Sequence, residues 1–259
     1  GPSGSLVPMG VFYISEVDAD DTGNSFGLSI KGYDQSGKIA KETLTSIYTI
    51  NGGTNVAVAI QQLLASREPG LKFNFSPTTY TTPKIILDLN QDCWAAALQL
   101  ATTIGMDLFF DRNGICTLRP TPNPAKAATS WTYTDRKSDN VGLMIDELQK
   151  IVIADGTVFN DVIVTGETTG TVDVYTGRAQ DLNSKSPTYV NGPFGDIPVF
   201  FKSSILTSNA QAQALADAKL RYFLGRADQL TLIGPPNPAQ DEEDVVKIIR
   251  SAMSINALY

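Results

Sequence analysis

Apolar and polar positions alternate in two neighbouring stretches near the start of the chain, as they do in half-buried strands. The stretches are 11–17 and 25–33, and residues 18–24 between them are polar and contain a glycine, which indicates a turn. Three apolar residues would share one face of the second strand: Phe26, Leu28 and Ile30. We therefore predict an antiparallel hairpin here.

The apolar spacing changes to a helical period after residue 54. Thr54 can cap the helix, and Pro69-Gly70 would end the helical region. One helical face would collect Val56, Ile60, Leu63 and Leu64. Phe73 and Phe75 then alternate with polar residues, and residues 84–89 predict a short, strongly apolar strand.

Residues 92–120 form the best-defined unit, with a helix, a stop, a strand, a turn and a second strand. Asn90 or Asp92 can cap the helix, and Gly105 suits the left-handed conformation that ends it. The apolar stripe consists of Cys93, Ala97, Leu100, Ala101 and Ile104. Its alanines would allow close packing against a sheet.

A tight turn joins the two strands of this unit, 106–110 and 115–119. Asn113-Gly114 predicts a two-residue type I′ turn, because both positions of that turn need positive φ. Pro120 would end the second strand. The residues that follow, 121–129, are rich in proline and alanine and predict a linker at a domain boundary.

Strands dominate the second half of the chain, with one late helix. The helix would run over 208–224, capped by Ser208 and ended by Gly225. Residues 161–166 predict a buried strand. Further strand-like stretches lie at 141–153, 171–175, 198–201, 229–233 and 245–249.

Composition supports a β-rich protein. Of the 259 residues, 42% are hydrophobic and only 18% are charged, whereas helical bundles need many exposed Glu and Lys. The net charge of −7 argues against nucleic acid or an anionic membrane surface as the main partner, since both require clustered Lys and Arg. The chain has no apolar run of about 18 residues, so we expect no transmembrane helix.

The chain contains no histidine, which excludes a Ser-His-Asp triad, a Cys-His dyad and a histidine-ligated zinc site. Its two cysteines, Cys93 and Cys116, are expected to be small buried hydrophobic residues, and a disulfide between them stays open.

Three polar motifs could carry chemistry, and each has a simpler interpretation. Asp107 and Asp111 could act as a carboxylate pair, but Asp111 begins a turn, where aspartate caps backbone N–H groups. The run 241–244 lacks the spacing of a calcium loop and is interpreted as a solvated acidic loop. The loop 51–54 precedes a helix but lacks a Walker lysine, so we interpret it as loop and cap.

Aromatic residues could form a sugar-binding platform, although such spacings are more typical of a core. These residues are Trp94, Phe109, Phe110, Trp131 and Tyr133. Residues 74–76 match a glycosylation sequon without a secretory context. No nucleophile, base and orienting group come together, so we expect no enzyme activity, no catalytic, cofactor-binding or metal-ligating residues, and no cofactor.

Taken in order, several segments resemble the tail hub proteins of phages and related contractile injection particles. They are 6–14, 31–36, 50–64, 92–120, 160–166 and 244–246. The match is best over 92–120, with an early Trp, Leu-Ala, Gly, an apolar-aromatic-Asp strand end, Gly and Leu-x-Pro. Gln35 stands where this family usually has arginine.

The resemblance implies an α+β, β-rich fold in which tube-protein-like β-barrel segments carry a small α/β insert. The expected organisation is a cloning remnant at 1–5, strands of a truncated first barrel-like region at 6–48, the insert at 49–122, and a second barrel-like domain with one helix at 123–259. The first region is expected to be truncated because such hubs usually have a further stretch before a segment like 6–14.

The function implied by the resemblance is a structural one. Such proteins form hub rings, often trimers, that join the tail tube to the spike or fibre. The expected partners are other copies of the chain and the tube, spike or fibre proteins, with no membrane and no specific nucleic acid. The expected location is the virion tail tip, assembled in the bacterial cytoplasm. The alternatives are a tail-associated peptidoglycan hydrolase and a glycan-binding module.

Overall fold

The computed structural model describes residues 8–21, 26–122, 128–135, 143–152, 158–167, 174–226, 228–241 and 244–259. The expected cloning remnant at 1–5 lies outside these ranges. Within them the chain forms four α-helices, one short 3-10 helix and sixteen strands, so the predicted α+β, strand-rich class is confirmed. The strands of the described ranges make six separate sheets of two to four strands, and none of these closes into a barrel. The barrel segments therefore stay a prediction.

The chain divides into two compact units. The first contains Gly1–Pro120 with Ile205–Thr207, and the second contains Thr121–Ser204 with Ser208–Tyr259. The division between Pro120 and Thr121 lies at the start of the proline- and alanine-rich segment.

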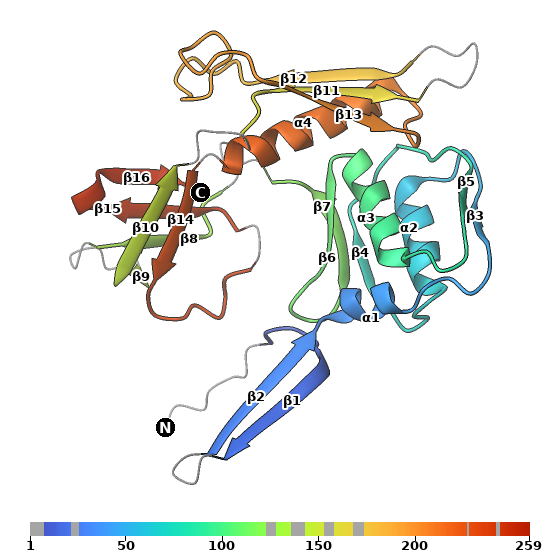
Figure 1. Cartoon of the computed structure of the whole chain (residues 1–259), viewed down its shortest axis with the longest axis horizontal. Helices are drawn as coiled ribbons and strands as arrows, with labels where there is room; N and C mark the ends of the chain where they lie inside the picture. Colours follow the sequence, from blue (N-terminus) through green and yellow to red (C-terminus); the bar gives the residue numbers. More distant parts are fainter. Residues whose placement is uncertain are drawn as a thin grey trace. The chain divides into compact units, whose positions relative to one another are not determined.

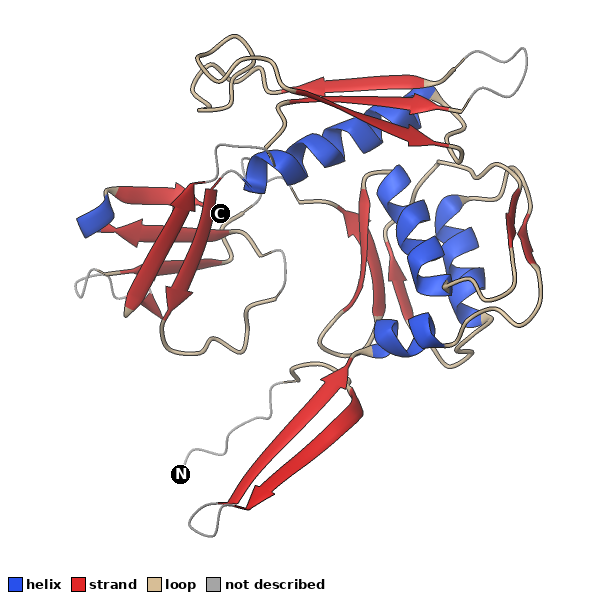
Figure 2. Ribbon diagram, in the orientation of Figure 1, coloured by secondary structure: helices blue, strands red, loops and turns tan. Residues whose placement is uncertain are grey.

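The first unit is built on a three-stranded sheet in the order β4-β7-β6. Its strands are β4 (Phe73–Phe75), β6 (Met106–Phe110) and β7 (Cys116–Pro120). β7 pairs in parallel with β4 and antiparallel with β6. The helices α2 (Val56–Ala65) and α3 (Cys93–Thr103) lie on one side of this sheet, as Figures 1 and 2 show.

The stripe predicted for α3 is the centre of the first core. Cys93, Ala97, Leu100, Ala101 and Ile104 are all buried, in one cluster with Leu63 and Leu64 of α2 and Leu118 of β7. Asp92 caps the helix by accepting hydrogen bonds from the Trp94 and Ala95 N–H groups at 2.8 and 3.0 Å. Gly105 follows the helix with a φ of 68°, so the predicted left-handed stop is confirmed.

Two local predictions in the first unit are wrong by a small margin. Asn55, not Thr54, caps α2, accepting from the Ala57 and Val58 N–H groups. The turn before β7 is a three-residue loop, because the Asp111 N–H donates to the Ile115 carbonyl and only Gly114 has positive φ. Such a loop needs one left-handed residue where a type I′ turn needs two.

Two short elements of the first unit, α1 (Gln35–Lys41) and β3 (Tyr48–Ile50), carry no strong periodic pattern and were not predicted. The helix α1 is capped by Asp34, which accepts from the Ser36 and Gly37 N–H groups. The strands β3 and β5 (Ile85–Leu87) pair antiparallel, and β5 corresponds to the apolar stretch predicted at 84–89.

The predicted hairpin at the start of the chain is confirmed. It consists of β1 (Tyr13–Asp21) and β2 (Phe26–Tyr33), paired antiparallel. β1 is longer than expected, since residues 18–21, predicted as turn, pair with residues 26–29. The remainder of the predicted turn, 22–24, and residue 25 of the predicted strand lie outside the described residues.

The second unit contains a three-stranded sheet in the order β12-β11-β13, with one long helix against it (Figure 1). The strands are β11 (Asp161–Gly166), β12 (Thr176–Gln180) and β13 (Pro198–Ser203), and the helix is α4 (Asn209–Arg226). β11 pairs antiparallel with β12 and parallel with β13. The Ser208 hydroxyl accepts from the Gln211 N–H at 3.2 Å, so the predicted cap of this helix is confirmed.

The helix α4 approaches β12 closely at Gly177. A Cβ atom at this position would lie 2.3 Å from the Ala212 carbonyl carbon and 2.4 Å from the Gln213 nitrogen. Ala212 and Ala216 are fully buried along the same helix. Only a glycine in the strand and small residues on the helix allow the two backbones to lie this close.

A second group of strands in this unit has its own core. One sheet has the order β16-β15-β8-β9, and β10 pairs with β14 in another. The strands are β8 (Trp131–Thr134), β9 (Leu143–Met144), β10 (Glu147–Val152), β14 (Asp228–Ile233), β15 (Val246–Arg250) and β16 (Ile255–Leu258), with the 3-10 helix η1 (Ser251–Met253) before β16. Tyr133, Ile248 and Ile255 are buried in this core, and Leu148 and Leu230 pack against them.

The sequence predictions for the second unit differ from the structure at three places. Gly225 does not end α4, which continues to Arg226. The strands β8 and β16 were not predicted. The strand expected at 171–175 is instead β12 at 176–180, and residues 171–173 lie outside the described residues.

Gly177→Ala tests the close approach of α4 to the sheet. The added methyl group would overlap backbone atoms that cannot rotate away, so we expect a loss of about 1–3 kcal/mol in the free energy of unfolding. Urea unfolding followed by circular dichroism measures it. Gly225→Ala is the matched control, because a Cβ there meets no atom within 4 Å and alanine favours a helix by roughly 0.5–1 kcal/mol. Equal stability of Gly177→Ala and the parent chain would contradict the packing described.

Candidate functional site

The polar motifs considered for catalysis have structural roles instead. The Asp111 carboxylate accepts hydrogen bonds from the Asn113 and Ile115 N–H groups at 2.9 and 2.8 Å, which is the turn-capping role predicted for it. Asp107 lies within β6, opposite Arg119 of β7. A carboxylate already engaged in closing a turn is a poor catalytic partner for Asp107.

The loop 51–54 uses its backbone donors within the protein. The Gly53 N–H donates to the Thr82 carbonyl at 2.8 Å, and the Thr54 N–H donates to the Asn51 carbonyl. These donors are not directed at a shared anion position, so the interpretation as a loop holds. Of the acidic run 241–244, Asp244 accepts from the Ser130 hydroxyl and the Asp241 N–H. Glu242 and Glu243 lie outside the described residues.

The aromatic residues considered for a sugar platform do not share one face. Trp94 stacks on Phe110 with ring centroids 5.3 Å apart, against the first core. Tyr133 is buried in a core of the second unit, and Trp131 packs against it. Phe109 lies under the guanidinium of Arg119. Asn74 of the sequon is exposed on β4.

Both cysteines are buried and free. Burial raises the pKa of the Cys116 thiol to about 12 and also raises the pKa of the Cys93 thiol. A thiol with a raised pKa is a weak nucleophile, because the reactive species is the thiolate. The prediction that they are small buried hydrophobic residues is therefore confirmed.

Among the described residues, no group of three or more Cys, Asp and Glu side chains is placed to hold a metal ion. The same part of the chain contains no helix of the length and apolarity that crossing a membrane requires.

The most unusual surface is one face of the β1–β2 hairpin, which we call the apolar hairpin face. Val17 lies opposite Ile30 and Ala19 opposite Leu28 in the register of the two strands. Five large apolar residues on this face are each more than half exposed: Ile14, Val17, Phe26, Leu28 and Ile30. Phe26 is 71% exposed. A contiguous apolar patch of this kind on a soluble protein usually marks an interaction site.

A β-bulge keeps this face continuous. Ile14 pairs with Gly32 and Glu16 with Lys31, so Ser15 is the extra residue of β1. In a regular strand without this bulge, Ile14 and Val17 would lie on opposite faces, because they are three residues apart and side chains alternate along a strand. The opposite face is polar, with an ion pair between Lys31 and Glu16 at 2.9 Å.

The base of the hairpin is fixed by α1, and the rest extends away from that helix in Figure 1. Tyr13 and Tyr33 stack with ring centroids 6.2 Å apart. The ammonium groups of Lys38 and Lys41 lie over these rings, at 5.2 and 3.9 Å from their centroids. A Cβ at Gly37 would lie 2.8 Å from the Tyr33 ring, so α1 packs directly on it.

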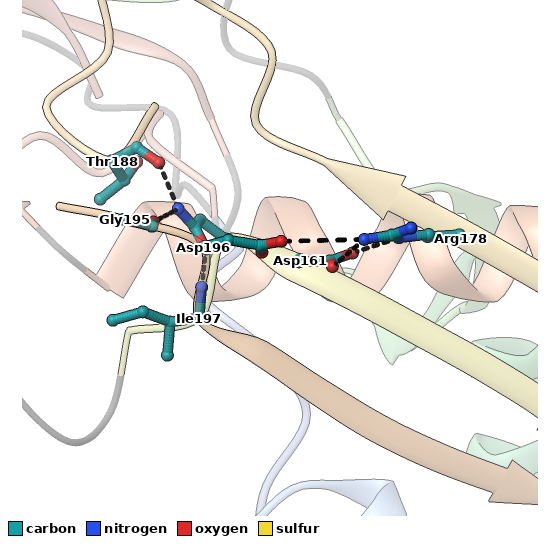
Figure 3. Close-up of polar contacts among 7 residues, drawn as sticks. Asp161, Arg178, Thr188, Gly195, Asp196 and Ile197 are labelled. Atoms are coloured by element: carbon teal, nitrogen blue, oxygen red, sulfur yellow. Dashed lines mark hydrogen bonds and ion pairs between the residues drawn. The ribbon is translucent and has the colours of Figure 1, made fainter. Parts of the chain in front are cut away.

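A second feature is a polar network that holds the long connection 181–197 between β12 and β13. Asn160 is fully buried, and its side-chain amide nitrogen donates to the Thr188 and Gly195 carbonyls at 2.8 and 2.6 Å. Its side-chain oxygen accepts from the Ile197 N–H at 2.7 Å. Figure 3 shows these contacts coming from Thr188, in the middle of the connection, and from Gly195 and Ile197 near its end.

The neighbouring Asp161 forms a two-point ion pair with Arg178. The Arg178 Nε and Nη2 atoms lie 2.9 and 2.6 Å from the two carboxylate oxygens, and Asp161 is buried while Arg178 is half exposed (Figure 3). The hydrogen bond to Asp161 and the attraction of Asp161 and Asp196 raise the pKa of Arg178, against the effect of its own desolvation. Both oxygens of the Asp161 carboxylate accept hydrogen bonds from the Arg178 guanidinium. The ion pair therefore joins β12 to β11, and this carboxylate is poorly placed to act as a general base.

At least 95% of the chain matches solved phage tail proteins in structure. A tail protein from Neisseria meningitidis MC58 is 17% identical with a TM-score of 0.68, and the match covers 96% of this chain and 73% of that one. The 43 kDa tail protein of prophage MuSo2 from Shewanella oneidensis is 12% identical with a TM-score of 0.63, covering 95% and 71%. The prophage tail protein gp18 from Listeria monocytogenes EGD-e is 13% identical with a TM-score of 0.54, covering 95% and 69%.

The chain has the phage tail protein fold. This confirms, at the level of the fold, the resemblance seen in the sequence. No protein-family model and no curated protein matches the chain. Identities of 12–17% establish the shared fold alone.

Sequence patterns indicated only part of these features. The alternation of Phe26, Leu28 and Ile30 predicted one apolar face but not that it would be exposed. Asn160, at the start of a buried strand, gave no sign that its side chain would hold a distant connection. The proximity of Asp161 to Arg178 depends on the pairing of β11 with β12, which the sequence does not fix.

Thiol labelling tests the burial of the cysteines. We expect Cys93 and Cys116 to react with Ellman's reagent near neutral pH only after unfolding in urea. Because the pKa of Cys116 is raised on folding, its contribution to stability is complete below the ordinary thiol value of 9.0 and is lost as the pH rises toward about 12. Rapid labelling of the native chain near neutral pH would show that these thiols are accessible.

Asn160→Ala tests the network that holds the connection 181–197. The change removes three side-chain hydrogen bonds and leaves the buried partners unsatisfied, at about 1–3 kcal/mol each. We expect trypsin to cleave after Lys185 at least about 10-fold faster, since cleavage follows the open population and about 1.4 kcal/mol changes it tenfold. Asn191→Ala, at an exposed position of the same connection, is the control. Unchanged cleavage in Asn160→Ala would argue against the anchoring role.

Proposed function

We propose that this chain is a structural subunit of a phage or phage-like tail tip, and that it forms a hub ring joining the tail tube to the spike or fibre. The observation that carries the proposal is a fold shared over at least 95% of the chain with tail proteins from three different bacteria. Persistence of one fold at 12–17% identity fits a role that depends on shape and surfaces.

Two further features support an assembly role. The apolar hairpin face exposes more large apolar residues than a monomeric protein usually tolerates, as expected for a surface that assembly covers. The net charge of −7 would keep DNA from adhering to a channel lined by such subunits. The expected partners are other copies of this chain and tube, spike or fibre proteins, and the expected location is the tail tip of the virion.

The polar groups that the structure describes favour this proposal over an enzyme. Asp111 closes a turn, Asp161 is held by Arg178, and both thiols are buried. A peptidoglycan hydrolase needs a positioned acid and base, and these side chains are engaged elsewhere.

Tail particles test the proposed function directly. Particles purified from the phage or prophage that encodes this chain are expected to contain it, by mass spectrometry, and to bind gold-labelled antibody at the tail tip in electron micrographs. A major tube protein from the same particles provides the control, since its label would follow the whole tail. Absence of the chain from intact particles, or clearing of cell walls in zymograms by the purified chain, would overturn the proposal.

A further inference from the structure

We propose that copies of this chain associate head to tail through the β1–β2 hairpin, so that β1 of one copy pairs with β2 of a second copy and the apolar hairpin faces are buried together. The inference deepens the proposed function, on which it rests for the role of the assembly, and it names the surface and its polarity.

The hairpin cannot bury its own apolar residues. It is a sheet of only two strands in the described part of the chain, and such a sheet is marginal in water without a covered face. Five large side chains more than half exposed present roughly 500 Å² of apolar surface. Three exposed apolar residues lead into β1, namely Met9, Val11 and Phe12. Together they approach the roughly 800 Å² per partner of a stable interface.

Each strand of the hairpin also has one edge that none of the described strands of the same copy covers. Exposed strand edges pair readily with strands of other chains. Neither strand contains a proline, and over its eight residues β2 has one charged side chain, Lys31. The edge of β2 is therefore little protected against strand addition.

The charges of the two strands select which edges meet. β1 carries four carboxylates, Glu16, Asp18, Asp20 and Asp21, whereas β2 carries one ammonium group. Pairing of β1 with β1 of a second copy would place two acidic strands side by side, which is unfavourable. Pairing of β1 with β2 places the acidic strand beside Lys31, whose side chain is 66% exposed.

Head-to-tail pairing has a geometric consequence. Because the two joined surfaces differ, each copy still offers a free edge to the next, and the series ends only when it closes into a ring. In the closed ring the apolar hairpin faces of all copies point inward, where they are buried against one another.

Substitutions on the two faces of β2 test the burial of the apolar hairpin face. Leu28→Asp is expected to reduce the mass measured by light scattering from that of an oligomer to that of a single chain. Ser29→Lys introduces a charge on the opposite face of the same strand, opposite Asp18 of β1, and is expected to leave the oligomer intact. The circular dichroism spectrum of the folded chain should be nearly unchanged in both, since Leu28 and Ser29 are exposed in a single copy. A monomeric parent chain, or an oligomer that Leu28→Asp leaves unaltered, would overturn the proposal.

Cross-linking tests the polarity of the association. Asp18→Cys on β1 and Ser29→Cys on β2 are co-expressed in one cell with different tags and treated with a short bismaleimide. The buried native thiols do not compete. We expect dimers that carry both tags to exceed, several-fold, the dimers formed by either variant alone. Equal cross-linking of Asp18→Cys alone would indicate β1–β1 pairing, and equal cross-linking of Ser29→Cys alone would indicate β2–β2 pairing; either result overturns the head-to-tail arrangement.

These outcomes are separate from the test of the proposed function. Head-to-tail cross-links in the purified chain with no protein in tail particles would leave the association standing and remove the tail-tip role. Protein at the tail tip without such cross-links would leave the tail-tip role standing and remove the head-to-tail association.

Discussion

Packing of α3 through very small side chains is the constraint on which the first unit depends. Its buried stripe includes Cys93, Ala97 and Ala101, none of which extends far beyond the helix backbone. The sheet, α2 and α1 can therefore all lie close to this one helix. Since α1 in turn holds Tyr13 and Tyr33 at the base of the hairpin, the hairpin is anchored through a helix that itself packs on α3.

The second unit solves a similar packing problem with a different residue. In this unit the small residue is in the strand: Gly177 has no side chain, so β12 can lie directly against the backbone of α4. The connection that leaves β12 is then held by Asn160, whose hydrogen bonds replace the sheet contacts that a long loop lacks. The same sheet thus carries a helix held by apolar packing, α4, and a connection held by buried hydrogen bonds, 181–197.

The sequence predicted the elements with strong periodicity and missed those set by tertiary contact. The cap at Asp92, the stop at Gly105 and the hairpin at the start of the chain follow from local chemistry, and all three are present. The helix α1 is too short to show a period, and β8 and β16 become strands through pairing with β15. Caps one residue away, as at Asn55, compete on nearly equal terms, so pattern alone cannot choose between them.

The candidate surface was predictable in its pattern but not in its exposure. The alternation of apolar and polar residues predicts that Phe26, Leu28 and Ile30 share a face. Whether that face is buried depends on which other parts of the chain pack against it. In this structure no element of the described chain covers it fully. A sequence pattern therefore predicts how a strand divides its residues between its faces, while only the fold tells which of those faces is left for another molecule.

The bulge at Ser15 sets which residues of β1 point to the apolar face and which to the polar face. One residue inserted into or deleted from the regular part of either strand would transfer every apolar side chain on the far side of the change to the polar face, with almost no alteration in composition. Residue identity is thus a poor measure of whether such a surface is kept in distant proteins. Among chains only 12–17% identical, the phase of alternation relative to the bulge is the quantity to compare.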